Sequence, residues 1–315
     1  MNLQQFRFVR ETIRCDFNLT RAARSLYTSQ PGVSKAIIEL ESELGVQIFE
    51  RHGKRIRGLT LPGKHVARVI ERIMVEIDNL KRVSDDFAHH DEGNLVIACT
   101  HAQARYLLPG VIPAFRKRFP KVRVSLAEGS PPTLAEMVLR DEADLAIATE
   151  TLNTTPGLVT LPVYDWEHVL VVKPDHPLTA LSSSEARHID LDTIARYPII
   201  TYDHAFSGRR TIDSVADDKD VTLDIVLSAI DADIIKTYVG VGLGVGIIAG
   251  MAFDPRRDKG LAGIPLGHLF GTHTTRVGVK SNVFLRDYVY EFISMLAADL
   301  TRETVAAAVM NGAAA

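Results

Sequence analysis

The sequence predicts an α/β protein with a winged helix-turn-helix at its N-terminus, and three observations lead to this class. Short helical patterns occupy residues 1–62 and end in a basic, glycine-containing stretch. One helical pattern without proline or glycine covers residues 64–88, and alternating strand and helix patterns begin at residue 93. Because 315 residues exceed one ordinary domain, we divide the chain into a head (1–62), a linker helix (63–90) and a large α/β region (91–315).

The composition is that of a globular protein, with 46% hydrophobic and 24% charged residues. No run of about 18 apolar residues predicts a membrane span, and the charged N-terminus does not resemble a signal peptide. Cys15 and Cys99 match neither a metal-binding nor a disulfide spacing. We therefore expect a cytoplasmic protein that has no metal, no cofactor and no contact with a membrane.

Charge is divided unevenly along the chain. Residues 1–70 hold 12 Lys and Arg against 6 Asp and Glu, whereas the remaining 245 residues hold 24 against 33. A basic head on an acidic body indicates that the head binds a polyanion, although a solvated basic surface would have the same composition.

Residues 18–51 begin with two short amphipathic helical patterns that are separated by a polar turn. Asn18 or Thr20 can cap the first helix and Ser29 the second, where Pro31 fits the first turn because its missing N–H is no loss. This predicts a helix-turn-helix, whose second helix enters the DNA major groove with its N-terminus. The candidate DNA contacts in the two helices are Thr20, Ser29, Gln30, Pro31, Ser34 and Lys35.

Within this set, Gln30 can bind an adenine edge, and Ser34 and Lys35 can bind bases or phosphates. An ordinary helical hairpin, in which Ser29 and Pro31 only form a cap, is the alternative. A basic stretch follows the second helix and contains the further candidates Arg51, Lys54 and Arg55. A basic hairpin beside a reading helix is typical of a winged helix-turn-helix, with the wing on phosphates or in the minor groove.

The helical pattern at 64–88 has apolar residues in steps of four and three, at Val66, Ile70, Ile73, Ile77, Leu80 and Phe87. Such a heptad seam predicts a helix that pairs with a partner helix. The alternative is a stripe that packs on its own domain.

From residue 93 the order of elements is that of an α/β fold. Strands are expected at 93–100, 122–129, 144–150, 168–173, 198–202, 224–229, 244–250 and 274–280, and helices at 104–119, 131–143, 231–242 and 286–300. This order predicts parallel sheets with right-handed crossovers. We expect two Rossmann-like subdomains, one of about 91–162 and 267–300 and one of about 163–266, with a cleft between them.

The cleft is the predicted ligand site, because ligands of open α/β sheets bind beyond the carboxyl ends of the strands, where helix N-termini attract anions. The candidates at strand ends are Thr100, His101, Ala102 and Gln103, then Thr149 and Glu150, then Thr201 and Tyr202. Each threonine alone is as well explained by capping, but three such ends in one cleft favour an oxyanion site. Trp166 either lines this pocket or packs between the subdomains.

These segments resemble one known family. The run LTRAARSLYTSQPGVSKAIIELESELGVQIFER, the following LTLPG and the long helix are similar to LysR-type transcriptional regulators. THAQARYLLP, ADLAIATE, YDWEHVLVV and PIITYD are similar to the CysB/Cbl-like branch, the activators of sulfur-assimilation genes. The resemblance extends over roughly residues 1–300.

The resemblance implies a winged helix-turn-helix that binds double-stranded promoter DNA, a dimerising linker helix and an effector domain resembling periplasmic binding proteins. It also implies a homotetramer, with RNA polymerase as a further partner. Proteins of this branch bind sulfate and acetylserine in the cleft, at positions that match Thr100, Gln103, Thr149 and Thr201 or Tyr202. Adenosine phosphosulfate is a third candidate effector. The family often has a hydroxyl residue where this chain has Ala102, a loss that would weaken or change the ligand.

No nucleophilic triad or carboxylate pair is apparent, so we expect a regulator and no enzyme. A cytoplasmic solute-binding or enzymatic α/β protein with an accessory helical head is the alternative. The glycine run at 240–246 follows a helix and leads into a strand, the reverse of a dinucleotide-binding fingerprint. Residues 207–210 are expected to form a capped loop, and 306–315 a frayed tail.

Overall fold

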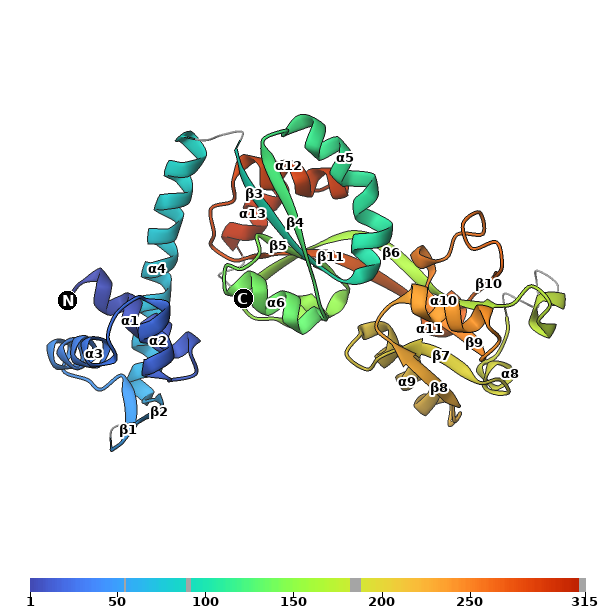
Figure 1. Cartoon of the computed structure of the whole chain (residues 1–315), viewed down its shortest axis with the longest axis horizontal. Helices are drawn as coiled ribbons and strands as arrows, with labels where there is room; N and C mark the ends of the chain where they lie inside the picture. Colours follow the sequence, from blue (N-terminus) through green and yellow to red (C-terminus); the bar gives the residue numbers. More distant parts are fainter. Residues whose placement is uncertain (54, 89–91, 182–187, 312–315) are drawn as a thin grey trace. The chain divides into compact units, whose positions relative to one another are not determined.

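Figure 1 shows the computed structural model of the chain, which describes residues 1–53, 55–88, 92–181 and 188–311. The chain forms two compact units, Met1–Ala88 and His89–Ala315. The long helix expected as a separate linker is thus part of the first unit. In the part of the chain that the structure describes, no helix is long and apolar enough to cross a membrane.

The first unit has the predicted winged helix-turn-helix. It consists of α1 (Leu3–Arg14), α2 (Leu19–Ser25), α3 (Gln30–Leu44), β1 (Phe49–His52), β2 (Arg55–Leu59) and α4 (Leu61–Ala88). The predicted caps are confirmed, because the Asn18 side chain accepts the N–H groups of Thr20 and Arg21, and Ser29 accepts that of Gly32. Val33, Ile37 and Leu40 on the inner side of α3 are fully buried in the core of the unit.

The wing is attached to α3 through one buried carboxylate. The Glu41 side chain accepts the backbone N–H groups of Ile48 and Phe49 at 2.8 and 3.0 Å and pairs with Arg51 at 2.9 Å. A buried charge is tolerated when it is paired and hydrogen-bonded in this way. Glu41 therefore fixes the start of the β1–β2 hairpin relative to the helix that precedes it.

The apolar stripe of α4 serves two purposes. Val66, Ile70 and Ile77 pack in the core of the first unit, as the alternative to a pairing seam proposed. Leu80 and Phe87 are 71% and 86% exposed, and Ile73 is exposed as well. The helix also starts earlier than expected, at Leu61, because the Thr60 hydroxyl accepts the N–H of Gly63. A seam is therefore left over only on the outer side of α4.

In the second unit, the first subdomain (subdomain I) is built on the predicted parallel strands β3 (Gly93–Cys99), β4 (Val122–Glu128) and β5 (Leu145–Ala148). Its helices are η1 (Gln103–Leu107), α5 (Leu108–Arg118), α6 (Pro131–Leu139), η2 (Glu150–Thr154), α12 (Asp287–Leu296) and α13 (Arg302–Asn311). η1 is a π-helical turn, a form that recurs at functional sites. The strand β11 (Thr272–Lys280) is antiparallel to β5, so the sheet is mixed rather than purely parallel.

The second subdomain (subdomain II) contains β7 (Ile199–Tyr202), β8 (Ile225–Ala229), β9 (Val245–Ala249) and β10 (Ala262–Pro265). Its helices are η3 (Pro177–Ala180), α8 (Leu191–Ala195), α9 (Ser207–Asp218), α10 (Ala232–Gly240), η4 (Gly250–Ala252) and α11 (Gly267–Phe270). β7 pairs in parallel with both β8 and β9. The glycines after α10 connect this helix to β9, as expected, with Gly242 at a φ of 84°.

One long strand connects the two subdomains. β6 (Leu158–Val172) was expected only at 168–173, but it extends through both halves of the sheet. It pairs antiparallel with β11 from Leu158 to Glu167 and with β9 and β10 beyond that point. The order is β4-β3-β5-β11-β6-β9-β7-β8, with β10 beside β6, and Figure 1 shows β6 and β11 passing from one subdomain to the other.

Two local predictions for the second unit were wrong. Residues 207–210 form the first turn of α9 and not a loop, because the apolar face of residues 212–216 packs against the subdomain II core. The tail expected to fray is helical as far as residue 311, because Val305 and Val309 of α13 are buried. The rest of that tail, 312–315, lies outside the described residues.

Candidate nucleic-acid interface and ligand cleft

The N-terminus of α3 presents the predicted DNA-reading residues at the surface. Thr20, Ser29, Pro31 and Lys35 are exposed, and Gln30 and Ser34 are half-buried. Lys35 is 80% exposed, with only Glu39 within 3.8 Å of its ammonium group. These side chains are therefore accessible to a partner that approaches the first turn of α3.

The predicted wing cations fall into two groups. Arg55 is exposed on β2, as is Arg57, whereas Lys54 lies outside the described residues. Arg51 is largely buried and is paired with Glu41, so its expected role in phosphate contact is not supported. The sequence alone showed a basic run and could not show that one member of it neutralises a buried carboxylate.

A cavity of about 50 Å³ lies in the cleft between subdomains I and II. It meets the starts of several helices: the turn after β3 at Thr100, α6 at Pro131, η2 at Thr149 and α9 at Gly208. The first N–H groups of a helix have no partner within the helix and carry its positive dipole end. The cavity is therefore an anion-binding environment made largely of backbone.

Most of the predicted cleft residues line this cavity. Thr100, His101, Ala102, Gln103, Thr149, Trp166 and Tyr202 do so. Thr201 does not: it is fully buried and its hydroxyl donates to the carbonyl of Ile247 at 3.0 Å, so its assignment as a ligand contact was wrong. β-strand alternation directs Thr201 and Tyr202 to opposite faces of the sheet. The side chain of Glu150 lies outside the described residues.

Gln103 is held in place by the strands that cross between the subdomains. Its Oε1 accepts from the hydroxyl of Tyr164 at 2.9 Å, and its Nε2 donates to Thr275 at 3.4 Å. Burial raises the pKa of the Tyr164 phenol, so this group stays a neutral donor. Gln103 is only 1% exposed, which makes it a rigid wall of the cavity with one amide proton left to offer.

The aromatic wall of the cavity is also preorganised. Trp166 stacks on His273, its direct partner in the β6–β11 register, with 4.6 Å between ring centroids. The Tyr202 hydroxyl accepts the N–H of Ala249, and burial raises the pKa of this phenol. Both expectations for Trp166 are met, because it lines the pocket and packs where the subdomains join.

A group of polar side chains, which we call the subdomain clasp, joins η1 to α10 beside the cavity. It consists of Arg105 and Tyr106 from subdomain I and Asp233 and Lys236 from subdomain II. Asp233 accepts from Tyr106 at 2.9 Å and from Arg105 at 2.8 Å, and Lys236 lies 3.2 Å from it. Lys236 also donates to the Tyr106 hydroxyl and to Asp258, both at 3.0 Å.

The electrostatics of the clasp favour its charged form. Burial alone raises the pKa of Asp233, but the hydrogen bond from Tyr106 and the charges of Lys236 and Arg105 outweigh it, and the pKa is lowered. The pKa of Lys236 is raised despite burial, because Tyr106 and Asp258 accept its protons. The sequence gave no sign of this group, since residues 105 and 236 are distant in the chain.

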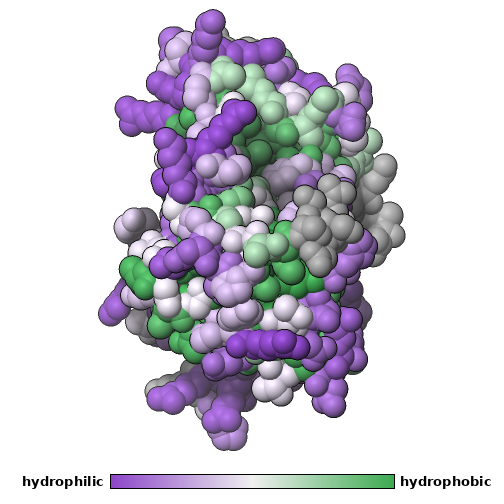
Figure 2. Space-filling model, turned by 90° about the vertical axis from the view of Figure 1, so that its right-hand side faces the viewer, coloured by the Kyte–Doolittle hydropathy of each residue, from purple (hydrophilic) through white to green (hydrophobic). Residues whose placement is uncertain are grey.

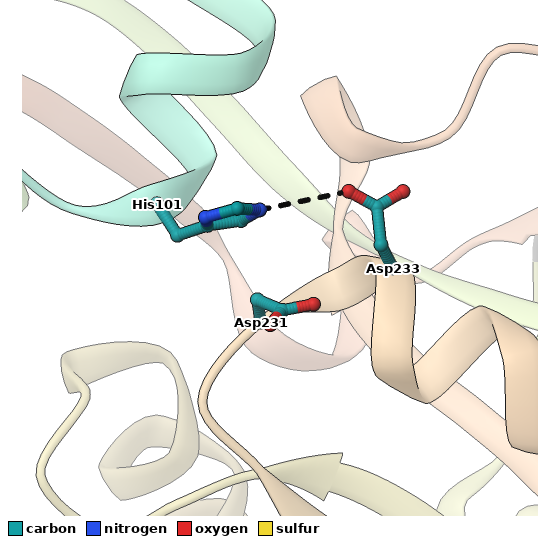
Figure 3. Close-up of side chains that lie close together, drawn as sticks. All are labelled: His101, Asp231 and Asp233. Carbon is teal, nitrogen blue, oxygen red and sulfur yellow. Dashed lines mark ion pairs between the residues drawn. The ribbon is translucent and has the colours of Figure 1, made fainter.

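Figure 3 shows His101 directed toward Asp233, with Asp231 beside them at the start of α10. The three side chains could supply the ligand atoms of a metal site. However, the Asp233 oxygens already accept from Tyr106 and Arg105, and Asp231 accepts the N–H of Ile234 as the cap of α10. Internal ion pairs and capping account for this cluster without a metal ion.

Two family descriptions match the chain. Residues 3–64 match the bacterial regulatory helix-turn-helix protein of the lysR family, and residues 88–301 match the LysR substrate binding domain. The chain belongs to the LysR family. Its curated relatives in this family are named transcriptional regulators, so it is a LysR-type DNA-binding regulator and not an enzyme.

Several LysR relatives are similar over their whole length. The chain is 56% identical over 305 residues to the HTH-type transcriptional regulator CysB of Burkholderia cenocepacia, which covers 97% of this chain and 96% of that one. It is 51% identical over 306 residues to SsuR of the same species, covering 97% and 98%. It is 44% identical over 311 residues to cbl of Escherichia coli K12, covering 99% and 97%.

Solved structures of LysR regulators have the same fold. The cofactor-binding domain of the Cbl transcriptional regulator matches with a TM-score of 0.65 and 42% identity, covering 70% of this chain and 94% of that one. Full-length OxyR from Pseudomonas aeruginosa matches with a TM-score of 0.63 and 20% identity, covering 96% and 98%. The second likeness concerns the fold alone.

The sequence missed a further set of cavity-lining residues in this LysR regulator. They come from helix starts and strand ends of both subdomains: Pro131, Phe206, Gly208, Ile230, Asp231, Ala249 and Met251. Pro131 and Asp231 could have been found, since each begins a predicted helix that follows a strand. The others depend on how α9 and η4 fold back over the cleft.

Replacing Asp233 with Asn should loosen the subdomain clasp. Losing the carboxylate removes a charged acceptor shared by Tyr106, Arg105 and Lys236, so the effector unit should lose about 1–2 kcal/mol of unfolding free energy at pH 7. The depressed pKa makes this stabilisation complete at neutral pH and lost as the pH falls below about 4. The difference from wild type should therefore vanish in acid.

Urea unfolding of the full chain, followed by circular dichroism at neutral and acidic pH, measures both effects. Asp217→Asn, an exposed change on α9, is the matched control and should leave the midpoint unchanged. Equal midpoints for Asp233→Asn and wild type at pH 7 would show that the clasp contributes nothing.

Proposed function

We propose that this LysR regulator controls sulfur-assimilation genes in response to a small anion that binds in the cavity between subdomains I and II. The convergence of helix starts at Thr100, Pro131, Thr149 and Gly208 is the observation that carries the proposal. The link to sulfur rests on the resemblance to the CysB/Cbl-like branch. The candidate effectors are sulfate, acetylserine and adenosine phosphosulfate.

The size of the cavity orders these candidates. A volume of about 50 Å³ holds a few non-hydrogen atoms, since a single water needs roughly 10–15 Å³ on the same measure. Sulfate fits this space, and acetylserine fits it with a small opening of the cleft. Adenosine phosphosulfate would require the subdomains to separate, so it is the least suited to this arrangement.

Ligand binding acts on the relation between the subdomains. The turn that begins at Thr100 continues into η1, which carries Arg105 and Tyr106 of the clasp. A ligand that binds the Thr100–Gln103 turn and subdomain II together favours the closed arrangement, in which the clasp is formed. The switch requires the ligand to bind the two arrangements unequally.

The DNA-reading role belongs to the first turn of α3. Replacing Gln30 with Ala should remove a contact to one base and relax sequence preference there by about 1–3 kcal/mol. Replacing Lys35 with Ala should weaken binding to every duplex and lower the slope of log affinity against log salt by about 1. Fluorescence anisotropy with a duplex selected by the wild-type chain, and with a scrambled one, measures both changes.

Lys219→Ala, an exposed change in the effector unit, is the matched control and should bind DNA like wild type. If both α3 variants keep the wild-type affinity, preference and salt slope, DNA reading by α3 is disproved.

Ligand binding should depend on the Thr100 hydroxyl. Thr100→Val keeps the shape of the side chain and removes a donor, so affinity should fall by about 1–2 kcal/mol. Calorimetry of the full chain with sulfate and with O-acetylserine measures the loss, and Thr222→Val in an exposed loop is the control. Undiminished affinity in Thr100→Val would place the ligand elsewhere.

We also propose a homotetramer, held by two apolar surfaces of the chain. One is the linker seam, the exposed residues Val69, Ile73, Leu80 and Phe87 on α4. The other is the α10 patch, the exposed residues Val226, Ile230, Ile234, Tyr238, Val241 and Leu243. Figure 2 views the subdomain II end of the molecule, where apolar green areas interrupt the hydrophilic surface. Pairing through two separate surfaces joins four copies, because each surface connects a different pair.

Mass photometry of single and double variants tests this assembly. Leu80→Asp should leave dimers paired through the α10 patch, Val241→Asp should leave dimers paired through the seam, and the double variant should be monomeric. Thr222→Asp is the control that retains the tetramer. A tetramer that survives the double variant would rule out these two surfaces.

A further inference from the structure

The ligand cavity has an uneven chemistry that narrows the class of effector. Hydrogen-bond donors lie on the subdomain I side, at Thr100, Gln103 and Thr149. The remaining wall is apolar or aromatic and includes Ala102, Trp166, Phe206, Ile230, Ala249 and Met251. A ligand that is polar on all sides would leave this second wall facing oxygen atoms.

The charge of the lining is equally informative. No lysine or arginine is among the described residues that line the cavity, and Asp231 contributes a carboxylate to it. His101, the only basic residue there among those described, is 3.0 Å from Glu128 and directed toward Asp233, as Figure 3 shows. A doubly charged anion is costly in such a site, because helix starts supply only partial charges and Asp231 repels the ligand in proportion to its charge.

A buried donor in the wall still needs an acceptor. The indole Nε1 of Trp166 is buried and has no hydrogen-bond partner among the described residues, and the side chain as a whole is 93% buried. Buried polar groups in native proteins are normally bonded, so this donor indicates a ligand oxygen or a bound water. The stacking of the ring on His273 leaves the indole little freedom to find another partner.

We propose that the effector is a singly charged oxyanion on a short apolar stem, of the alkanesulfonate or short carboxylate type, and not bare sulfate. The inference rests on the proposed cleft site and makes it more specific. The anionic head binds the helix starts and the donors of Thr100 and Thr149, and the stem lies against Phe206, Ile230 and Met251. Ala102 is the specificity residue, because a methyl group occupies the position where a hydroxyl would favour a ligand with oxygens on every side.

Competition between matched anions tests the proposal directly. Calorimetry of the full wild-type chain at constant ionic strength compares sulfate with methane-, ethane- and propanesulfonate, and butyrate distinguishes a carboxylate head from a sulfonate head. Each methylene that the wall accepts should tighten binding about fourfold, so the sulfonates should strengthen with length and ethanesulfonate should exceed sulfate at least tenfold.

Two variants separate the causes. Ala102→Thr should reduce the ratio of ethanesulfonate to sulfate affinity at least threefold, by adding a donor for sulfate and narrowing the space for a stem. Asp231→Asn keeps an α10 cap of similar quality and removes a negative charge. Its fold-gain for sulfate should be about the square of that for ethanesulfonate, because the repulsion scales with ligand charge.

The outcomes distinguish this inference from the function on which it rests. Sulfate that binds as tightly as ethanesulfonate, or sulfonates that do not strengthen with length, would overturn the inference and leave the anion site intact. Binding of none of these anions by wild type would instead remove the anion site itself. Thermal melts of both variants identify any that fail to fold, and the wild-type comparison needs neither of them.

Discussion

The antiparallel pairing of β6 with β11 is the constraint on which the effector unit depends. The two strands cross from one subdomain to the other, and their register places Trp166 directly opposite His273 at the crossing. Tyr164 on β6 and Thr275 on β11 both bond to Gln103, so the same pair of strands orients the turn that carries Thr100. The cavity is therefore built on the connection between the subdomains and not on either one alone.

The placement explains how a small ligand can affect a large structure. The turn after β3 contacts the cavity and leads directly into η1, whose Arg105 and Tyr106 reach Asp233 on the opposite subdomain. Polar contacts of this kind form only when the subdomains are close, whereas the β6–β11 ladder persists in any arrangement. Effector binding and subdomain contact thus share one short segment, residues 100–106.

Sequence reasoning worked where local physics decides the outcome. Asn18, Ser29 and Pro31 cap or begin helices through bonds to residues two or three positions away, and these were predicted correctly. Thr100, Gln103 and Thr149 reach the cleft because strand ends of a parallel sheet meet at one edge. The family resemblance added the assembly and the ligand class, which no local pattern contains.

It failed where a distant partner decides. Arg51 belongs to a basic run, but Glu41 on α3 captures it, and Thr201 is directed into the sheet toward Ile247. The clasp joins residues more than a hundred positions apart, and the α13 helix becomes stable only through burial of Val305 and Val309. Such contacts follow from tertiary packing, which a single sequence does not display.

The central claim is that ligand binding in the cleft changes DNA binding by the head. It is tested most directly by fluorescence anisotropy of the full chain on its selected duplex, with the anion that calorimetry identifies as the tightest ligand present at zero and at saturating concentration. The account predicts that DNA affinity differs between the two conditions for wild type and differs less for Thr100→Val at the same ligand concentration. Identical DNA affinity for wild type in both conditions, with the cleft shown to be occupied, would contradict it.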